Sequence, residues 1–186
     1  ASNAVAGTFD ASGNTYTILA AQVVAGAAFS CTFTNDKQRN LTLKKAWVNA
    51  KQNDAATVTA TGLTSLNAVA DTSTETDVAP AQLATVGSTI TLGETITTGT
   101  GNYNAVLNCS KDSDNSVVAV NASNQIIMPD AAVSCIYTNT RKTRTVTLSK
   151  ALSPITDSGR FNLLINGNAV ATNIGNGGSG NVVVPV

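Results

Sequence analysis

The heptapeptide Ser134-Cys135-Ile136-Tyr137-Thr138-Asn139-Thr140 carries the clearest signal in this chain. A second version, Ser30-Cys31-Thr32-Phe33-Thr34-Asn35-Asp36, lies near the N-terminus. In both versions apolar and polar residues alternate, which is typical of a strand with one buried face. A short basic stretch follows each version, and a matching strand comes next, at residues 40–46 and 145–151. The chain therefore contains an internal repeat.

The spacing of this repeat predicts tandem domains. The two versions lie 104 to 105 positions apart, which is too long for a solenoid unit and matches one β-sandwich domain. We interpret residues 1–38 as the C-terminal part of one repeat, 39–142 as a complete repeat and 143–186 as the N-terminal part of a third. The residues Ala1-Ser2-Asn3-Ala4 resemble the scar of a cleaved purification tag. The two end segments are expected to be completed by strands of their neighbours or of each other.

Composition favours an all-β chain. Thr, Val, Ile and Asn are abundant, and β-branched residues favour strands. Within residues 39–142, period-2 alternation predicts several strands, which indicates an antiparallel, immunoglobulin-like β-sandwich. Core-facing positions are expected at Leu41, Leu43 and Lys45; at Ile90, Leu92, Glu94 and Ile96; at Tyr103, Ala105, Leu107 and Cys109; and at Val133, Cys135, Tyr137 and Asn139.

Charge and composition also narrow the function. The formal net charge is zero and the chain has no His, so no basic surface for nucleic acid or anionic lipid is expected, and His-based catalysis is excluded. No metal, cofactor or enzymatic turnover is expected. Asp112, Asp114 and Ser116 have the alternate spacing of a calcium loop but lack its Gly and distal Glu, and a solvated turn is the better interpretation.

Three predicted core positions carry polar residues. Lys45, Glu94 and Asn139 are in phase with apolar neighbours, and a buried charge without a partner costs several kcal/mol. These three side chains therefore need one another or water. The alternative is that Lys45 and Glu94 lie at strand ends and reach solvent.

These residues and their surroundings resemble the prealbumin-like, or CnaB-type, repeats of bacterial surface adhesins and pilins. The matching elements are Leu43-Lys44-Lys45, Gly93-Glu94-Thr95-Ile96 with Gly101-Asn102-Tyr103, and Tyr137-Thr138-Asn139-Thr140. The resemblance implies a stalk or adhesion module in which many members form a Lys-to-Asn isopeptide bond. Lys45 would attack Asn139, and Glu94 would carry the proton. The doublet with Lys44 leaves the reactive Lys open, although Lys45 keeps the parity of Leu41 and Leu43.

Cysteine usage predicts one disulfide. Cys109 and Cys135 occupy core-facing positions of two late strands, and their pairing would stabilise the repeat by about 3 kcal/mol. Cys31 would be left free or paired abnormally. The alternative is three buried thiols in a reducing compartment. The disulfide implies an oxidising, extracellular or cell-surface location.

The sequence as a whole predicts a structural stalk or adhesion repeat of a bacterial surface or secreted protein. Its partners would be neighbouring repeats and a host surface protein or glycan. The alternative is a ligand-binding sandwich module with a site in loops such as residues 64–78. An enzyme ranks third.

Overall fold

The chain forms two compact units, Ala1–Asn35 and Asp36–Val186. The computed structural model describes residues 7–10, 15–26, 28–29 and 34–186. In the first unit, strands β1 (Gly7–Asp10) and β2 (Thr15–Ile18) form an antiparallel hairpin, and η1 (Ala20–Gln22) is a single 3₁₀ turn. Cys31 lies outside the described residues.

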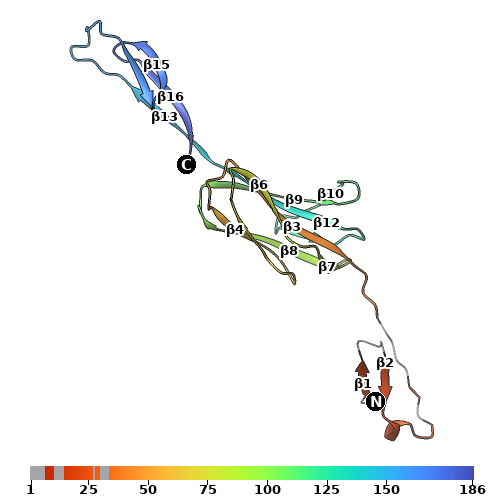
Figure 1. Cartoon of the computed structure of the whole chain (residues 1–186). Helices are drawn as coiled ribbons and strands as arrows, with labels where there is room; N and C mark the ends of the chain where they lie inside the picture. Colours follow the sequence, from red (N-terminus) through yellow and green to blue (C-terminus); the bar gives the residue numbers. More distant parts are fainter. Residues whose placement is uncertain (1–6, 11–14, 27, 30–33) are drawn as a thin grey trace. The chain divides into compact units, whose positions relative to one another are not determined.

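The second unit begins with a β-sandwich of two sheets, shown in Figure 1. The larger sheet has the order β10-β9-β12-β3-β6, with β7 also paired to β3, and the smaller has the order β11-β8-β4-β5. The strands of the larger sheet are β3 (Gln38–Val48), β6 (Thr74–Val78), β7 (Gln82–Thr85), β9 (Tyr103–Lys111), β10 (Val117–Val118) and β12 (Val133–Arg141). Those of the smaller sheet are β4 (Ala55–Ala60), β5 (Leu66–Val69), β8 (Thr89–Thr98) and β11 (Gln125–Ile127). The all-β sandwich expected from the sequence is confirmed.

The first and last strands of the sandwich lie side by side. Strand β12 pairs with β3 in parallel, from Val133 opposite Leu41 to Thr140 opposite Val48. The other strand pairs of the sandwich are antiparallel. Because β3 and β12 run in the same direction, the chain enters the sandwich at one end and leaves it at the other.

Strand β3 is long enough to take two partners on its other edge. Strand β7 pairs with its first part and β6 with its second. Pro80 lies between β6 and β7. Proline has no backbone N–H to donate, so it belongs at a break between strands rather than within a central strand.

The core forms between the two sheets from residues that alternate along each strand. Along β3 the side chains of Leu41, Leu43, Lys45 and Trp47 are fully buried, and along β12 every second residue from Val133 to Asn139 is buried. These patterns confirm the phase expected for both strands. Ala105 in β9 is exposed, contrary to expectation, although Tyr103 and Cys109 in the same strand are buried.

Residues 143–186 form two antiparallel strand pairs, of which only the second is a hairpin. Strand β13 (Thr143–Ser149) pairs with β16 (Ser179–Pro185), and β14 (Phe161–Ile165) pairs with β15 (Asn168–Ile174). Residues 175–178 make the turn between β15 and β16. Val146 and Leu148 of β13 are 42% and 36% exposed, whereas Leu41 and Leu43 of β3 are fully buried. The apolar residues of β13 thus lack the cover that β3 receives in the sandwich.

Candidate functional site

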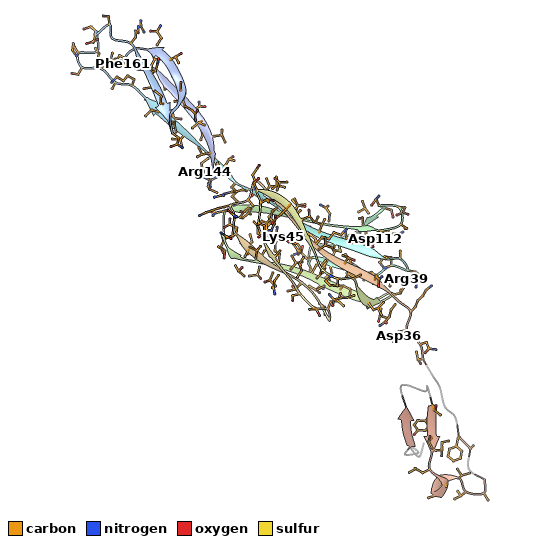
Figure 2. The ribbon with its side chains drawn as sticks, viewed as in Figure 1. Asp36, Arg39, Lys45, Asp112, Arg144 and Phe161 are labelled. Carbon is orange, nitrogen blue, oxygen red and sulfur yellow. A yellow bond between two sulfur atoms is a disulfide. The ribbon has the colours of Figure 1, made fainter. Side chains whose placement is uncertain are left out.

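The three polar residues expected on apolar faces are all placed in the core of the sandwich. Lys45 on β3 and Asn139 on β12 are fully buried, and Figure 2 shows Lys45 within the central sandwich. Glu94 lies on β8 of the facing sheet, with a side chain only 6% exposed. Its Oε1 atom lies 3.4 Å from Lys45 Nζ. The alternative that Lys45 and Glu94 reach solvent at strand ends is wrong.

Strand register places Asn139 beside this ion pair. In the parallel ladder Lys45 is opposite Tyr137, and Asn139 is opposite Trp47. Lys45 and Asn139 are therefore diagonal neighbours on the buried face of one sheet, and such neighbours lie within reach of a long side chain. Lys44 alternates to the other face and is only partly buried, so Lys45 is the member of the doublet that lies on the same face of the sheet as Asn139.

The electrostatics of the site favour a reactive amine. Burial lowers the pKa of Lys45 from 10.5 to about 8, against the opposing effect of Glu94. The ammonium donates a hydrogen bond to the backbone oxygen of Ala46 at 2.9 Å and lies 3.8 Å from the centre of the Trp47 ring. An amine with a pKa near 8 is neutral in a useful fraction of molecules at neutral pH, and the neutral amine is the nucleophile.

Unsatisfied polar atoms concentrate around this amine. Buried side-chain atoms usually have hydrogen-bond partners. Among the described residues seven buried side-chain atoms have none. Two of them are Ser116 Oγ and Glu94 Oε1, and the latter forms the ion pair with Lys45 from the facing sheet. The other five belong to residues of β3, β6 and β12 at or near the ladder positions of Lys45: Trp47 Nε1, Asp77 Oδ2, Tyr137 Oη, and Asn139 Nδ2 and Oδ1. The carboxamide of Asn139 is thus buried with neither end hydrogen-bonded.

A second buried polar group shows the ordinary arrangement. Asp54 is buried near the other core cluster, and its Oδ2 atom accepts a hydrogen bond from Tyr103 Oη at 2.5 Å. The same hydroxyl accepts a bond from the backbone N–H of Lys51. Tyr103 also packs edge-on against Trp47, with ring centres 5.3 Å apart. This satisfied cluster has the features of a structural contact, in contrast to the unsatisfied Asn139.

Sequence reasoning missed Asp77 as a neighbour of Lys45. Residues 64–78 were expected to be a loop, and this expectation is wrong, because β5 and β6 lie within them. In β6 the partly buried residues Glu75 and Asp77 alternate with exposed ones. That period of two was a usable signal, but inward-facing acidic residues on a short edge strand do not give the usual apolar pattern.

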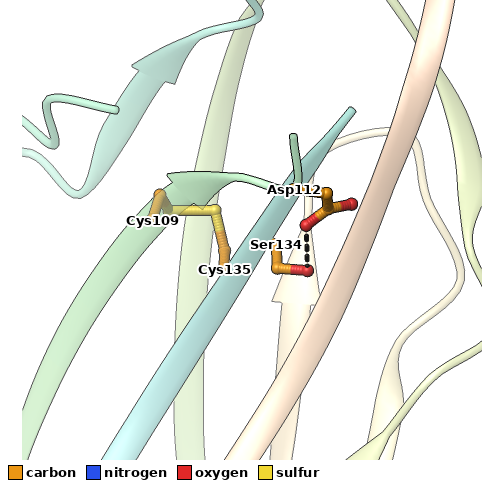
Figure 3. Close-up of a disulfide and its surroundings, with 4 residues drawn as sticks. All are labelled: Cys109, Asp112, Ser134 and Cys135. Atoms are coloured by element: carbon orange, nitrogen blue, oxygen red, sulfur yellow. Dashed lines mark hydrogen bonds between the residues drawn. A yellow bond between two sulfur atoms is a disulfide. The ribbon is translucent and has the colours of Figure 1, made fainter. Parts of the chain in front are cut away.

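The predicted disulfide joins two neighbouring strands. Cys109 on β9 and Cys135 on β12 are directly opposite in the ladder, with Cα atoms 4.1 Å apart. Both residues are buried, and Figure 3 shows the bridge between the two strands. Next to it, the Ser134 hydroxyl donates a hydrogen bond to Asp112 Oδ1 at 2.7 Å. The disulfide ties β12 to β9 on the side away from β3.

The described part of the chain gives little support for a metal site, a membrane-spanning helix or a ligand pocket. No group of three or more His, Cys, Asp or Glu is placed there to hold a metal ion, and no helix there is long and apolar enough to cross a membrane. Asp114 Oδ1 accepts a bond from the backbone N–H of Ser116, as in an ordinary turn. A hollow is lined by residues that include Thr64, Pro80 and Gln82, but the Gln82 amide already bonds the backbone N–H and C=O of Thr64.

Comparison with known proteins gives no match to the chain among family models, curated proteins or solved structures. The arguments for function therefore rest on the residues and their geometry.

Proposed function

We propose that residues 39–142 are a structural repeat of a bacterial surface or secreted stalk or adhesin, and that an isopeptide bond between Lys45 and Asn139 joins its first and last strands. The observation that carries the proposal is the buried Asn139 carboxamide, unpaired at both ends, beside a buried Lys45 in contact with Glu94. Each unpaired buried polar group costs about 1 to 3 kcal/mol. A covalent bond between the two side chains removes the buried ammonium charge.

The chemistry balances with the residues present. The Lys45 ammonium gives one proton to the Glu94 carboxylate, and the neutral Nζ attacks Cγ of Asn139. The bond from Nζ to Cγ forms and the bond from Cγ to Nδ2 breaks. A second proton from Nζ passes through Glu94 to Nδ2, which leaves as ammonia. Glu94 remains protonated beside the new amide, in a site where burial favours its neutral form. The event occurs once per molecule and is not enzymatic turnover.

The strand arrangement supports a mechanical role. The chain enters at the start of β3 and leaves at the end of β12, and these parallel strands are neighbours. Tension between the two ends would therefore shear the whole ladder rather than open it one bond at a time. A bond from Lys45 to Asn139 would carry that tension past every residue between them. Together with the disulfide it would connect β9, β12 and β3 covalently.

The end segments support a tandem array. The hairpin of β14 and β15 has a counterpart in β4 and β5. Leu163 is opposite Ala171 in the first pair, and Val58 is opposite Leu66 in the second. The two pairs are separated by the spacing of the sequence repeat. We propose neighbouring repeats as the partners of this chain, with non-covalent strand pairing at its ends. A cell-surface or extracellular location and a host protein or glycan as the final target belong to the same proposal.

Intact mass spectrometry after full reduction tests the proposal. The wild-type protein should weigh one ammonia less than its sequence, and proteolysis should give a branched peptide that contains Lys45 and Asn139. The variants Asn139→Ala and Glu94→Ala should both have their full sequence masses. A wild-type protein with its full sequence mass after prolonged incubation would refute the cross-link.

A further inference from the structure

Strand β6 brings a second carboxyl group to the Lys45 amine. In the antiparallel ladder between β3 and β6, Asp77 is directly opposite Lys45, and Glu75 is opposite Trp47. Directly opposite residues of an antiparallel pair have Cβ atoms about 4.5 to 5.5 Å apart and project from the same face. Lys45 projects into the core, so Asp77 projects toward the core beside it.

Apart from Lys45, the Trp47 indole is the one side chain that favours the charged form of Asp77, because it lowers the pKa of this carboxyl group. Its Oδ2 atom is buried and has no hydrogen-bond partner. Glu75, the next residue on the same face, is occupied elsewhere: its carboxylate accepts bonds from the backbone N–H groups of Asp71 and Thr72. Burial and the nearby charge of Glu75 raise the pKa of Asp77. The charge on Asp77 in turn favours the protonated form of Lys45.

The titratable groups that face Lys45 come from three strands. Glu94 on β8 makes the ion pair, Tyr137 on β12 is opposite in the parallel ladder, and Asp77 on β6 is opposite in the antiparallel ladder. Tyr137 is neutral because burial and the charge of Glu94 raise its pKa. Lys45 is therefore an amine between two acids, of which only Glu94 is in salt-bridge contact.

We propose that Asp77 is a positioning residue that holds Lys45 in its charged, unreactive form and so slows the reaction with Asn139. The proposal rests on the isopeptide chemistry proposed above. A negative charge beside Lys45 opposes the proton transfer to Glu94 that must precede attack, because it stabilises the ammonium and repels the electron pair that the neutral amine exposes. Asp77 thus acts against Glu94, although both are carboxyl groups.

The C-terminal segment lacks this second acid. Lys150 corresponds to Lys45 at the spacing of the sequence repeat, and it lies just beyond the ladder of β13 and β16, where its backbone N–H bonds the carbonyl oxygen of Gly178. The retarding carboxyl is therefore a property of the central sandwich rather than of the repeated pattern.

The decisive experiment measures the Lys45 pKa in protein that cannot react. In the Asn139→Ala background, the Lys45 side chain is titrated by NMR, with and without Asp77→Asn. We expect the substitution to lower the Lys45 pKa by about one unit, which is about a tenfold gain in neutral amine. Glu75→Gln is the matched control, since it removes the same charge from the same strand opposite Trp47, and it should change the Lys45 pKa much less. An unchanged pKa in Asp77→Asn, or an equal change in Glu75→Gln, overturns the proposal.

A rate measurement then separates this inference from the proposed function. Protein with Asn139 is made by a short cell-free synthesis, and the loss of ammonia is followed by intact mass. Asp77→Asn and Asp77→Val should lose ammonia several-fold faster than wild type, and either variant alone suffices if the other does not fold. An equal or slower rate overturns the role of Asp77. Failure of wild type and both variants to lose ammonia refutes the cross-link itself, whatever the NMR titration shows.

Discussion

The substitution Asn139→Ala tests the cross-link through the sign of its effect on stability. Lys45 and Asn139 enclose about 90 residues, and the disulfide shortens the closed path to about 70, for which the chain-entropy model gives about 4 kcal/mol. Loss of the cross-link should lower the melting temperature by roughly 15 °C for a domain of this size. If no cross-link exists, the same substitution removes two buried atoms without partners and should stabilise the protein or leave it unchanged.

Thermal unfolding of oxidised wild type, Asn139→Ala and the double variant Lys45→Met with Glu94→Met at neutral pH makes this comparison. The double variant is the control, because replacement of a whole buried ion pair by apolar side chains of similar size is often neutral or stabilising, whereas removal of one partner alone leaves an unpaired buried charge. Both variants should melt well below wild type and by similar amounts. Variants that melt at or above the wild-type temperature would refute the reasoning, even if their masses were as expected.

Three further predictions concern the same sandwich. Lys44→Ala should still weigh one ammonia less than its sequence, because Lys44 lies on the other face of β3. If intact mass spectrometry gives this variant its full sequence mass, Lys44 is the nucleophile. In Asn139→Ala the Lys45 amine stays free, with a pKa of about 8 in the folded protein and an ordinary value of 10.5. Between these two pH values the unfolded chain binds more protons than the folded protein. The free energy of unfolding should therefore rise with pH, by at most about 1.4 kcal/mol per pH unit. Urea unfolding at pH 8, 8.5 and 9, compared with Lys45→Met, measures that rise, and equal slopes in the two variants would contradict it. Replacement of Cys109 and Cys135 by Ser should lower the free energy of unfolding by about 3.5 kcal/mol, which is the value that the same entropy model gives for a closed loop with a sequence separation of 26. Urea unfolding measures this loss, and an unchanged midpoint would show that the disulfide does not stabilise the sandwich.

The parts of the fold that could be predicted are the strands in which apolar and polar residues alternate. Leu41, Leu43 and Lys45 share a face because side chains alternate along any strand, and the same rule placed Cys135 and Asn139. Strands β5, β6 and β7 escaped prediction. Strand β6 carries acidic residues on its inner face, and its pattern lacks the apolar residues by which a half-buried strand is identified.

The candidate site could be predicted only in part, for the same reason. The phase of Lys45, Glu94 and Asn139 indicated three polar residues facing the core, and the energetic cost of burying them indicated that they meet. Their separation along the chain gave no information about which strands are neighbours. Asp77 and Tyr137 enter the site through ladder pairing with Lys45, which depends on strand order.

The sequence by itself determined the all-β class and the inward phase of Lys45, Glu94, Asn139 and the two cysteines of the disulfide, because side-chain alternation is a local property of the extended chain. Only the tertiary structure decided that β3 and β12 are parallel neighbours, that Glu94 approaches Lys45 from the facing sheet, and that Asp77 lies opposite the same amine. Strand order and sheet packing are set by how the whole core excludes water, and that is a property of contacts between residues far apart in the chain.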